Sequence, residues 1–127
     1  MSFDDVKADL VRLYQIHADD PAARLREEDV QRWSISLDVS RSELYDQIAI
    51  YLARRFNGSE LSFEFCDAIV NDLHDVITSA DEERPDLFWK VYLAFDEGEY
   101  YHGNNREQDP VEVYTRPQIT QIVSAIS

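Results

Sequence analysis

Glycine, proline and cysteine are scarce in this chain of 127 residues. Only three glycines and four prolines are present, which excludes a flexible linker or a low-complexity segment. The single cysteine, Cys66, excludes an internal disulfide and a cysteine-based metal site, and it favours a reducing compartment in which Cys66 is a small buried side chain. No apolar run approaches the roughly 20 residues that span a bilayer, and the acidic start does not resemble a signal peptide, so the sequence predicts a cytoplasmic protein.

The residues that are abundant predict an ordered single domain covering residues 1–127. Hydrophobic residues make up 44% of the chain and charged residues 30%, a balance typical of globular proteins. The length suffices for one hydrophobic core, and neither an internal repeat nor a linker divides the chain.

Helical periodicity dominates the chain. Apolar residues recur at steps of three and four, the spacing that lines one face of a helix, in six successive segments. The fold class is therefore predicted to be mostly α, a single-domain helical bundle of about five or six helices. The expected segments are residues 3–17, 20–33, 40–56, 59–76 (capped by Ser59 or Ser62), 85–95 and 115–126. The core is expected to include Phe65, Ile69, Phe88, Val91, Tyr92 and Phe95.

Two segments carry more specific local signals. Asp20 and Pro21 suit a helix cap and a first-turn proline, so the second helix is expected to begin there. Residues 103–110 are polar and predict an exposed loop, after which Val111–Tyr114 is the one stretch expected to be extended, as a short strand or edge segment.

The negative charge is large and unevenly distributed. The net charge is −14, and residues 60–113 contribute 15 acidic and three basic residues, whereas residues 1–59 contribute 11 and eight. An acidic surface repels phosphate and attracts basic proteins, so direct binding to nucleic acid is disfavoured and a basic protein partner is favoured. The simpler alternative is that the charge serves only solubility.

The segment from Arg84 to His102 combines the densest aromatic content with a sudden run of acids. Carboxylates resist burial without a partner, so the residues after Phe95 predict an exposed acidic and aromatic surface. The alternative is a frayed helix end whose tyrosines pack on the last helix. The candidate partner-binding residues are Asp96, Glu97, Glu99, Tyr100 and Tyr101.

Residues 29–48 have the outline of a helix-turn-helix, with Asp38 at the usual turn glycine and Ser40 as the cap of the second helix. Such a motif would read DNA with basic or amide groups at the start of that helix, where Arg41 is followed by Glu43 and Asp46. An ordinary two-helix corner is therefore favoured, and a DNA-binding transcriptional regulator is kept as the alternative function.

No catalytic or nucleotide-binding motif occurs, so the sequence predicts neither an enzyme nor a cofactor. Two groups of acids and histidine have the residue types of metal ligands, but no metal site is expected. Asp72, His74 and Asp75 face different directions on a helix, and Asp96, Glu99 and His102 lack a further ligand at a recognisable distance.

Four features from Tyr51 onward resemble the small helical immunity proteins of the colicin D immunity type. These are a helix ending near residues 52–56, the sequence GSELSFEF at 58–65, the sequence LFWKVYLAFDEGEYY at 87–101, and a closing helix begun by Arg116 and Pro117. The resemblance covers about the last 75 residues. It implies a cytoplasmic bacterial protein without catalysis of its own, which binds and blocks a cognate toxin domain, usually a basic nuclease.

Overall fold

The computed structural model describes residues 2–102 and 107–126, and within these ranges every regular element is helical. This confirms the predicted helical bundle. None of the helices in the described part of the chain has the length and apolarity to span a membrane. The elements are α1 (Phe3–Val11), η1 (Arg12–Ile16), α2 (Glu27–Leu37), α3 (Arg41–Asn57), α4 (Phe63–Ser79), α5 (Asp86–Asp96), η2 (Glu97–Glu99), η3 (Val111–Thr115) and α6 (Arg116–Ile126).

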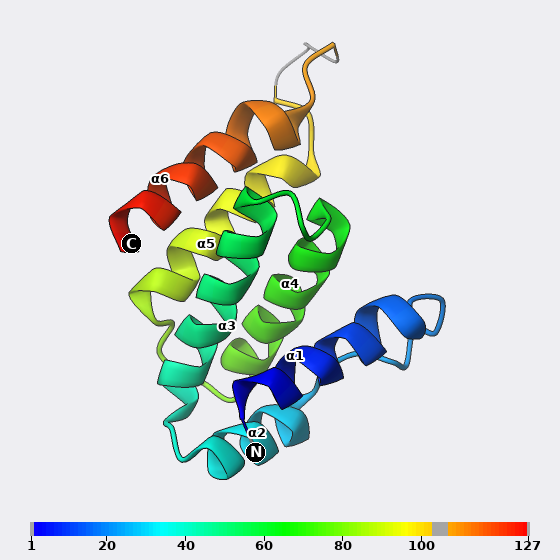
Figure 1. Cartoon of the computed structure of the whole chain (residues 1–127), viewed down its shortest axis with the longest axis vertical. Coiled ribbons are helices and arrows are strands. Elements are labelled where there is room, and N and C mark those ends of the chain that lie inside the picture. Colours follow the sequence, from blue (N-terminus) through cyan, green and yellow to red (C-terminus); the bar gives the residue numbers. More distant parts are fainter. Residues whose placement is uncertain (1, 103–106, 127) are drawn as a thin grey trace.

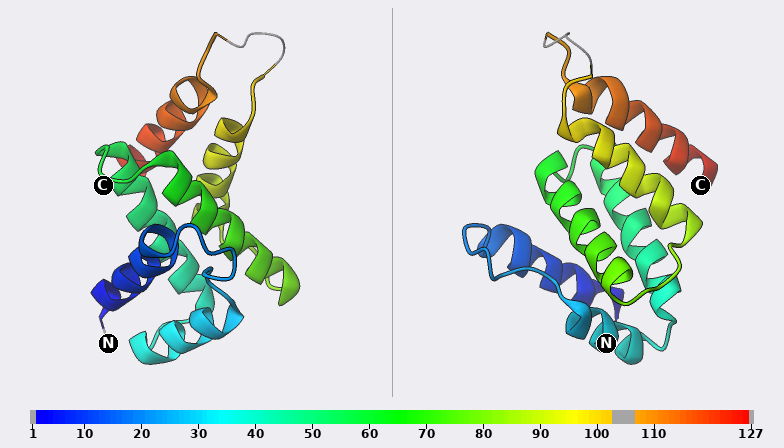
Figure 2. Two further views of the ribbon diagram at one scale, coloured as in Figure 1. Left: turned by 90° about the vertical axis from the view of Figure 1, so that its right-hand side faces the viewer. Right: turned by 180° about the vertical axis from the view of Figure 1, so that it is seen from behind.

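Helix α3 lies at the centre of the bundle. It contacts α2, α4, α5 and α6, so most of the other helices pack around it. Helices α1 and α2 lie together at one end of the molecule, whereas α6 lies beside α5 toward the other end (Figure 1; Figure 2). The predicted loop at residues 103–110 lies partly outside the described residues. The described turn η3, which precedes α6, lies at that second end, far from α1 and α2 (Figure 1; Figure 2).

One hydrophobic core joins these helices. Five of the six predicted core residues are buried, and Tyr92 is the exception, because it is only partly buried at the edge of the core. Cys66 is fully buried as expected, and burial raises the pKa of its thiol to about 12. The largest fully buried side chains are Trp33, Tyr45, Phe56, Phe88, Phe95, Leu10, Leu25, Leu44, Ile48, Leu52, Ile69 and Leu73.

Serine caps begin the two longest helices. The Ser40 hydroxyl accepts a hydrogen bond from the backbone N–H of Glu43 at 3.1 Å, and the Ser62 hydroxyl accepts one from Phe65 at 3.1 Å. Of the two serines predicted for α4, Ser62 is therefore the cap. These caps fix where α3 and α4 begin.

The prediction that a helix begins at Asp20 and Pro21 is wrong, because α2 begins at Glu27. Asp20 instead closes a local turn, in which its Oδ1 accepts a hydrogen bond from the N–H of Ala22 at 2.9 Å. Contacts with residues distant in sequence then keep residues 20–26 out of a helix. The backbone N–H of Leu25 donates to the hydroxyl of Tyr14 at 3.0 Å, and the guanidinium of Arg24 donates to Asp72 at 2.5 Å.

The prediction of an extended segment at Val111–Tyr114 is also wrong, because these residues form the helical turn η3. Asp109 initiates it by accepting a hydrogen bond from the N–H of Val111 at 3.0 Å on its Oδ1. The buried hydroxyl of Thr115 anchors its end by donating to the carbonyl of Ala94 at 2.7 Å. These contacts outweigh the strand preference of valine and tyrosine, which is weak and depends on context.

Candidate functional site

The surface shared by α4 and α5 brings two stripes of side chains together. Along α4 they step by four and three residues, and along α5 and η2 by three, four and three, so each stripe follows one side of its helix. The two helices pack against each other (Figure 2). We call this surface the α4–α5 face, and its members are Asp67, Asn71, His74, Trp89, Tyr92, Asp96 and Glu99.

Three partly exposed rings stack at the centre of the α4–α5 face. His74 from α4 lies 4.6 Å from Tyr92 and 5.7 Å from Trp89, measured between ring centroids, and the rings are tilted by only 17° and 26°. Trp89 and Tyr92 lie 5.1 Å apart at 12°. The guanidinium of Arg84 lies 3.8 Å from the centroid of the Trp89 ring, within the range of a cation–π contact. The stack therefore offers flat aromatic surface that already accepts a guanidinium.

Carboxyl groups border the rings on the side of η2. Burial, followed by hydrogen bonding and repulsion from Glu99, raises the pKa of Asp67 to about 8. Burial also raises the pKa of Asp96, and the negative charges of Glu99 and Glu97 raise it further. The amide of Asn71 donates to Glu99 at 3.1 Å and so ties η2 to α4. Asp67, Asp96 and Glu99 thus form one acidic cluster, in which the pKa of Asp67 favours its protonated form at neutral pH.

No cation neutralises this cluster within the described ranges. Asp67, Asp96 and Glu99 form no ion pair there, and Oδ1 of Asp67 is buried without a hydrogen-bond partner. Elsewhere on α4 the situation differs, since Asp72 and Asp75 both pair with Arg24, at 2.5 and 3.3 Å. At neutral pH the acidic cluster therefore places the negative charges of Asp96 and Glu99, without a paired cation, beside partly exposed rings.

The structure turns one of the five predicted binding residues, Glu97, away from the α4–α5 face. Asp96 and Glu99 belong to the α4–α5 face, but the carboxylate of Glu97 accepts a hydrogen bond from Gln118 of α6 at 2.7 Å. Tyr100 and Tyr101 follow η2 and are 51% and 45% exposed. The predicted segment is therefore a corner between two surfaces.

His102 fixes the exposed end of this corner. Its ring stacks on Tyr100 at 4.6 Å and meets Tyr114 of η3 at 3.8 Å, and its Nε2 is 2.9 Å from the carbonyl of Glu97. Tyr100 therefore contacts His102, which in turn contacts Tyr114 of η3, the turn before α6. This arrangement is similar to the alternative in which the tyrosines pack on the last helix. His102 makes these contacts instead of joining Asp96 and Glu99.

Sequence reasoning missed the part of the site that α4 supplies. From the sequence alone, His74 is considered only as a metal ligand, Tyr92 is expected in the core, and Asp67 is not singled out. The spacing of Asp67, Asn71 and His74 held the signal, because it repeats the steps of a helical stripe with polar residues. Pairing that stripe with α5 requires the tertiary structure.

The residues weighed as metal ligands on α4 have other partners. Asp72 accepts hydrogen bonds from the hydroxyl of Tyr14 at 2.6 Å and from Arg24, whereas His74 stacks on Tyr92. Across residues 2–102 and 107–126 no three His, Cys, Asp or Glu side chains are arranged so that they could hold a metal ion.

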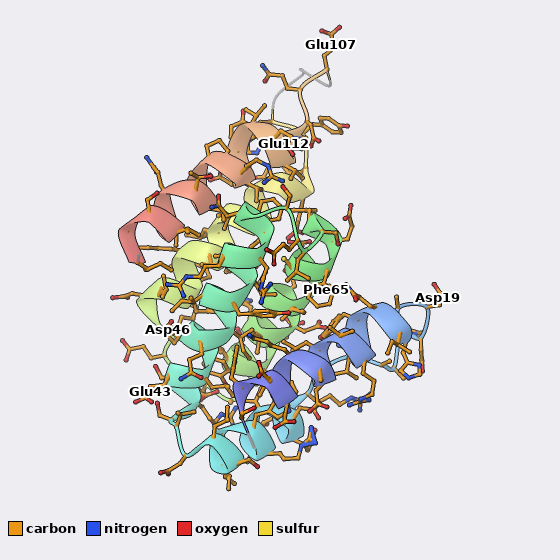
Figure 3. The ribbon with its side chains drawn as sticks, viewed as in Figure 1. Asp19, Glu43, Asp46, Phe65, Glu107 and Glu112 are labelled. Atoms are coloured by element: carbon orange, nitrogen blue, oxygen red, sulfur yellow. The ribbon has the colours of Figure 1, made fainter. Side chains whose placement is uncertain are left out.

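Residues 29–48, which have the outline of a helix-turn-helix, form a corner between α2 and α3. Asp38 has φ 56° and ψ 47°, the left-handed conformation usual for glycine at such a turn. Arg41, the residue on which DNA reading depends, is already engaged. Its guanidinium pairs with Glu27 at 3.2 Å and with Glu82 at 2.9 Å, while Glu43 and Asp46 follow on the same helix (Figure 3).

We therefore predict that the chain does not bind duplex DNA near physiological salt. The acids around Arg41 repel the phosphate backbone, which supplies most of the affinity of DNA-binding proteins. A fluorescence titration with labelled duplexes should show no sequence-dependent binding below micromolar concentration. Tight, sequence-dependent binding that is lost in the variant Arg41→Ala would contradict this and favour the regulator.

The raised pKa of Asp67 predicts a stability that falls as pH rises. An unfolded aspartate ionises near pH 3.9, whereas Asp67 in the folded protein holds its proton to about pH 8. Between these values the folded state binds more protons, so stability is highest on the acidic side of the window and is lost toward pH 8. Relative to the wild type, Asp67→Asn should gain on the order of 1 kcal/mol between pH 5 and pH 9, because the half-buried site is partly screened.

Urea unfolding at pH 5, 7 and 9 measures this difference. Glu64→Gln is the matched control, since it also neutralises one carboxyl group of α4 but at an exposed position. The same pH dependence in Asp67→Asn and in the wild type would show that Asp67 is ionised throughout.

Comparison of the chain with protein-family models, with curated proteins and with solved structures finds no match. The resemblance to immunity proteins thus stays an expectation, and function is inferred from the α4–α5 face.

Proposed function

We propose that this chain is a protein-binding module that engages a basic surface of another protein through the α4–α5 face, and that it neutralises a cognate toxin domain without catalysis of its own. One observation carries the proposal: an acidic cluster without a counter-cation among the described residues lies beside a stack of partly exposed aromatic rings.

The chemistry of this face suits lysine and arginine side chains. Carboxylates attract cationic groups over a distance and pair with them on contact, which speeds association and aligns the partner. Tyrosine and tryptophan add rigid contact area at low entropic cost, and binding energy often concentrates on such residues. Arg84 over Trp89 shows within this chain how a guanidinium lies on these rings.

A nuclease domain is the kind of toxin that such a face would block. A nuclease binds the phosphate backbone through a basic surface, so an acidic protein can occupy the same surface and exclude the substrate. This matches what the resemblance to immunity proteins implies. The proposed partner is therefore a basic protein domain, with no nucleic acid, membrane or cofactor involved.

Charge reversal tests the proposal on the product of an adjacent gene that encodes a basic domain. The double variant Asp96→Lys with Glu99→Lys should slow association about tenfold or more at low salt and reduce its salt dependence, because steering depends on the local field. Stopped-flow or surface-plasmon-resonance kinetics at several salt concentrations measure both effects.

The matched control is Asp19→Lys with Glu28→Lys, which changes the net charge equally at exposed positions outside the α4–α5 face. Figure 3 shows Asp19 at the tip of the loop that follows η1. Association should stay within about twofold of the wild type. If both double variants slow association equally, association depends on the net charge of the protein and not on the α4–α5 face. If neither variant slows association, the binding surface lies elsewhere.

A further inference from the structure

A separate hollow lies between α1 and the second half of α3, and none of its residues belongs to the α4–α5 face. Its volume is about 470 Å³, within the range of roughly 300 to 1,000 Å³ that is usual for small-molecule sites. The residues that line it are Phe3, Lys7, Gln47, Ile50, Tyr51, Arg54 and Arg55.

One part of the lining of this hollow is aromatic and apolar, and the rest is basic or polar. Phe3 from α1 and Tyr51 from α3 meet edge to face, with ring centroids 6.0 Å apart and planes at 82°. The ammonium group of Lys7 lies 5.6 Å from the Phe3 ring and 5.2 Å from the Tyr51 ring. Ile50 completes the apolar lining. The hollow can therefore hold a flat ring with a cation close to it.

Three cations converge here in a protein whose net charge is −14. Lys7 lies 3.5 Å from Asp4, whose side chain is 86% exposed, so this pair is weak, and Arg55 is paired with Glu60. The guanidinium of Arg54 has neither an ion pair nor a hydrogen bond within residues 2–102 and 107–126. Arg54 is thus left to bind an anion at the rim of an aromatic hollow.

The surroundings of the hollow favour a ligand with a single negative charge. Arg54 and Arg55 lie in the last turn of α3, where the helix dipole is negative and opposes a multiply charged anion. Glu60 beside Arg55 opposes it further. A single carboxylate on a flat ring matches both the one unpaired guanidinium and the aromatic part of the lining, since guanidinium binds carboxylate through two parallel hydrogen bonds.

We propose that this hollow binds a small aromatic monocarboxylate, with its ring against the side chains of Phe3 and Tyr51 and its carboxylate on Arg54. The amide of Gln47 supplies a second polar group within the lining. This ligand site goes beyond the proposed binding of a basic protein.

Naphthalene-2-carboxylate is a suitable probe, followed by ¹H–¹⁵N NMR of the full chain. Saturable shifts should appear at residues 3–7 and 47–55, with a Kd on the order of 1 mM or tighter. The variant Arg54→Gln should weaken binding about tenfold or more. Arg12→Gln is the matched control, because it removes an exposed arginine outside the hollow and should leave the Kd unchanged.

Two further ligands separate the parts of the proposal. Naphthalene-2-carboxamide keeps the ring without the charge, and inorganic phosphate keeps negative charge without the ring, so both should bind at least tenfold more weakly. Equal binding of the carboxamide, equal binding of phosphate, or the absence of saturable shifts at residues 3–7 and 47–55 would each overturn the proposal. Retention of the wild-type Kd in Arg54→Gln, with its spectrum otherwise folded, would do so as well.

Discussion

Replacing Phe95 with alanine should lower the free energy of unfolding by about 3 to 5 kcal/mol, the usual cost of deleting a fully buried aromatic ring. Phe95 is completely buried on the inner side of α5. Its ring centroid lies 5.2 Å from that of Phe56 on α3, edge to face, and 6.0 Å from that of Phe63 on α4. The ring therefore joins three helices, and its loss leaves a cavity that none of them can fill alone.

Urea unfolding monitored by circular dichroism measures this effect, with the denaturant slope expected to remain unchanged. Leu93→Ala is the matched control on the same helix, because Leu93 is 38% exposed and should cost less than about 1 kcal/mol. A cost for Phe95→Ala as small as that of the control would remove Phe95 from the core.

Removing the carboxylate of Glu82 should destabilise the fold by about 2 to 3 kcal/mol, because it leaves a buried hydroxyl and a largely buried guanidinium without their main partner. The hydroxyl of Tyr45 donates to Glu82 at 2.6 Å, and the guanidinium of Arg41 donates to it at 2.9 Å. Tyr45 is 1% exposed, and burial followed by its bond to Glu82 raises its pKa. This network fastens the connection between α4 and α5 to the start of α3.

Glu82→Ala is best measured beside Glu83→Ala, the adjacent exposed glutamate, which should change stability by less than about 0.5 kcal/mol. The double variant Glu82→Ala with Tyr45→Phe should recover part of the loss, since the unpaired hydroxyl is then absent. Equal small effects for both single variants would mean that water replaces the carboxylate and that the network does not stabilise the fold.

The helices could be predicted from the sequence where one apolar stripe extends over several turns. This holds for α3 and α4, whose buried residues follow the predicted spacing and whose serine caps are local signals. It fails at residues 20–26, where Asp20 and Pro21 look like a helix start but the N–H of Leu25 bonds to Tyr14, 11 residues away. It fails again at Val111, because the hydroxyl of Thr115 anchors η3 to a carbonyl 21 residues away.

The candidate site could be predicted only in part for the same reason. Asp96 and Glu99 stood out because acids follow an aromatic helix at once, a signal contained within one segment. Asp67 and Asn71, which interact with them, come from another helix, and charge patterns along a chain do not report which helices pack together. Glu97 illustrates the converse, since adjacency in sequence suggested a shared surface, whereas its carboxylate faces α6.

Amide hydrogen exchange of the complex with the basic domain encoded by the adjacent gene tests the central claim most directly. If the α4–α5 face binds that partner, added protection should concentrate at residues 67–75 and 86–101, and Asp96→Lys with Glu99→Lys should abolish it at equal concentration. Protection confined to the corner at residues 27–48, or to α1 and the hollow beside it, with residues 67–75 and 86–101 unchanged, would contradict the assignment of the binding face.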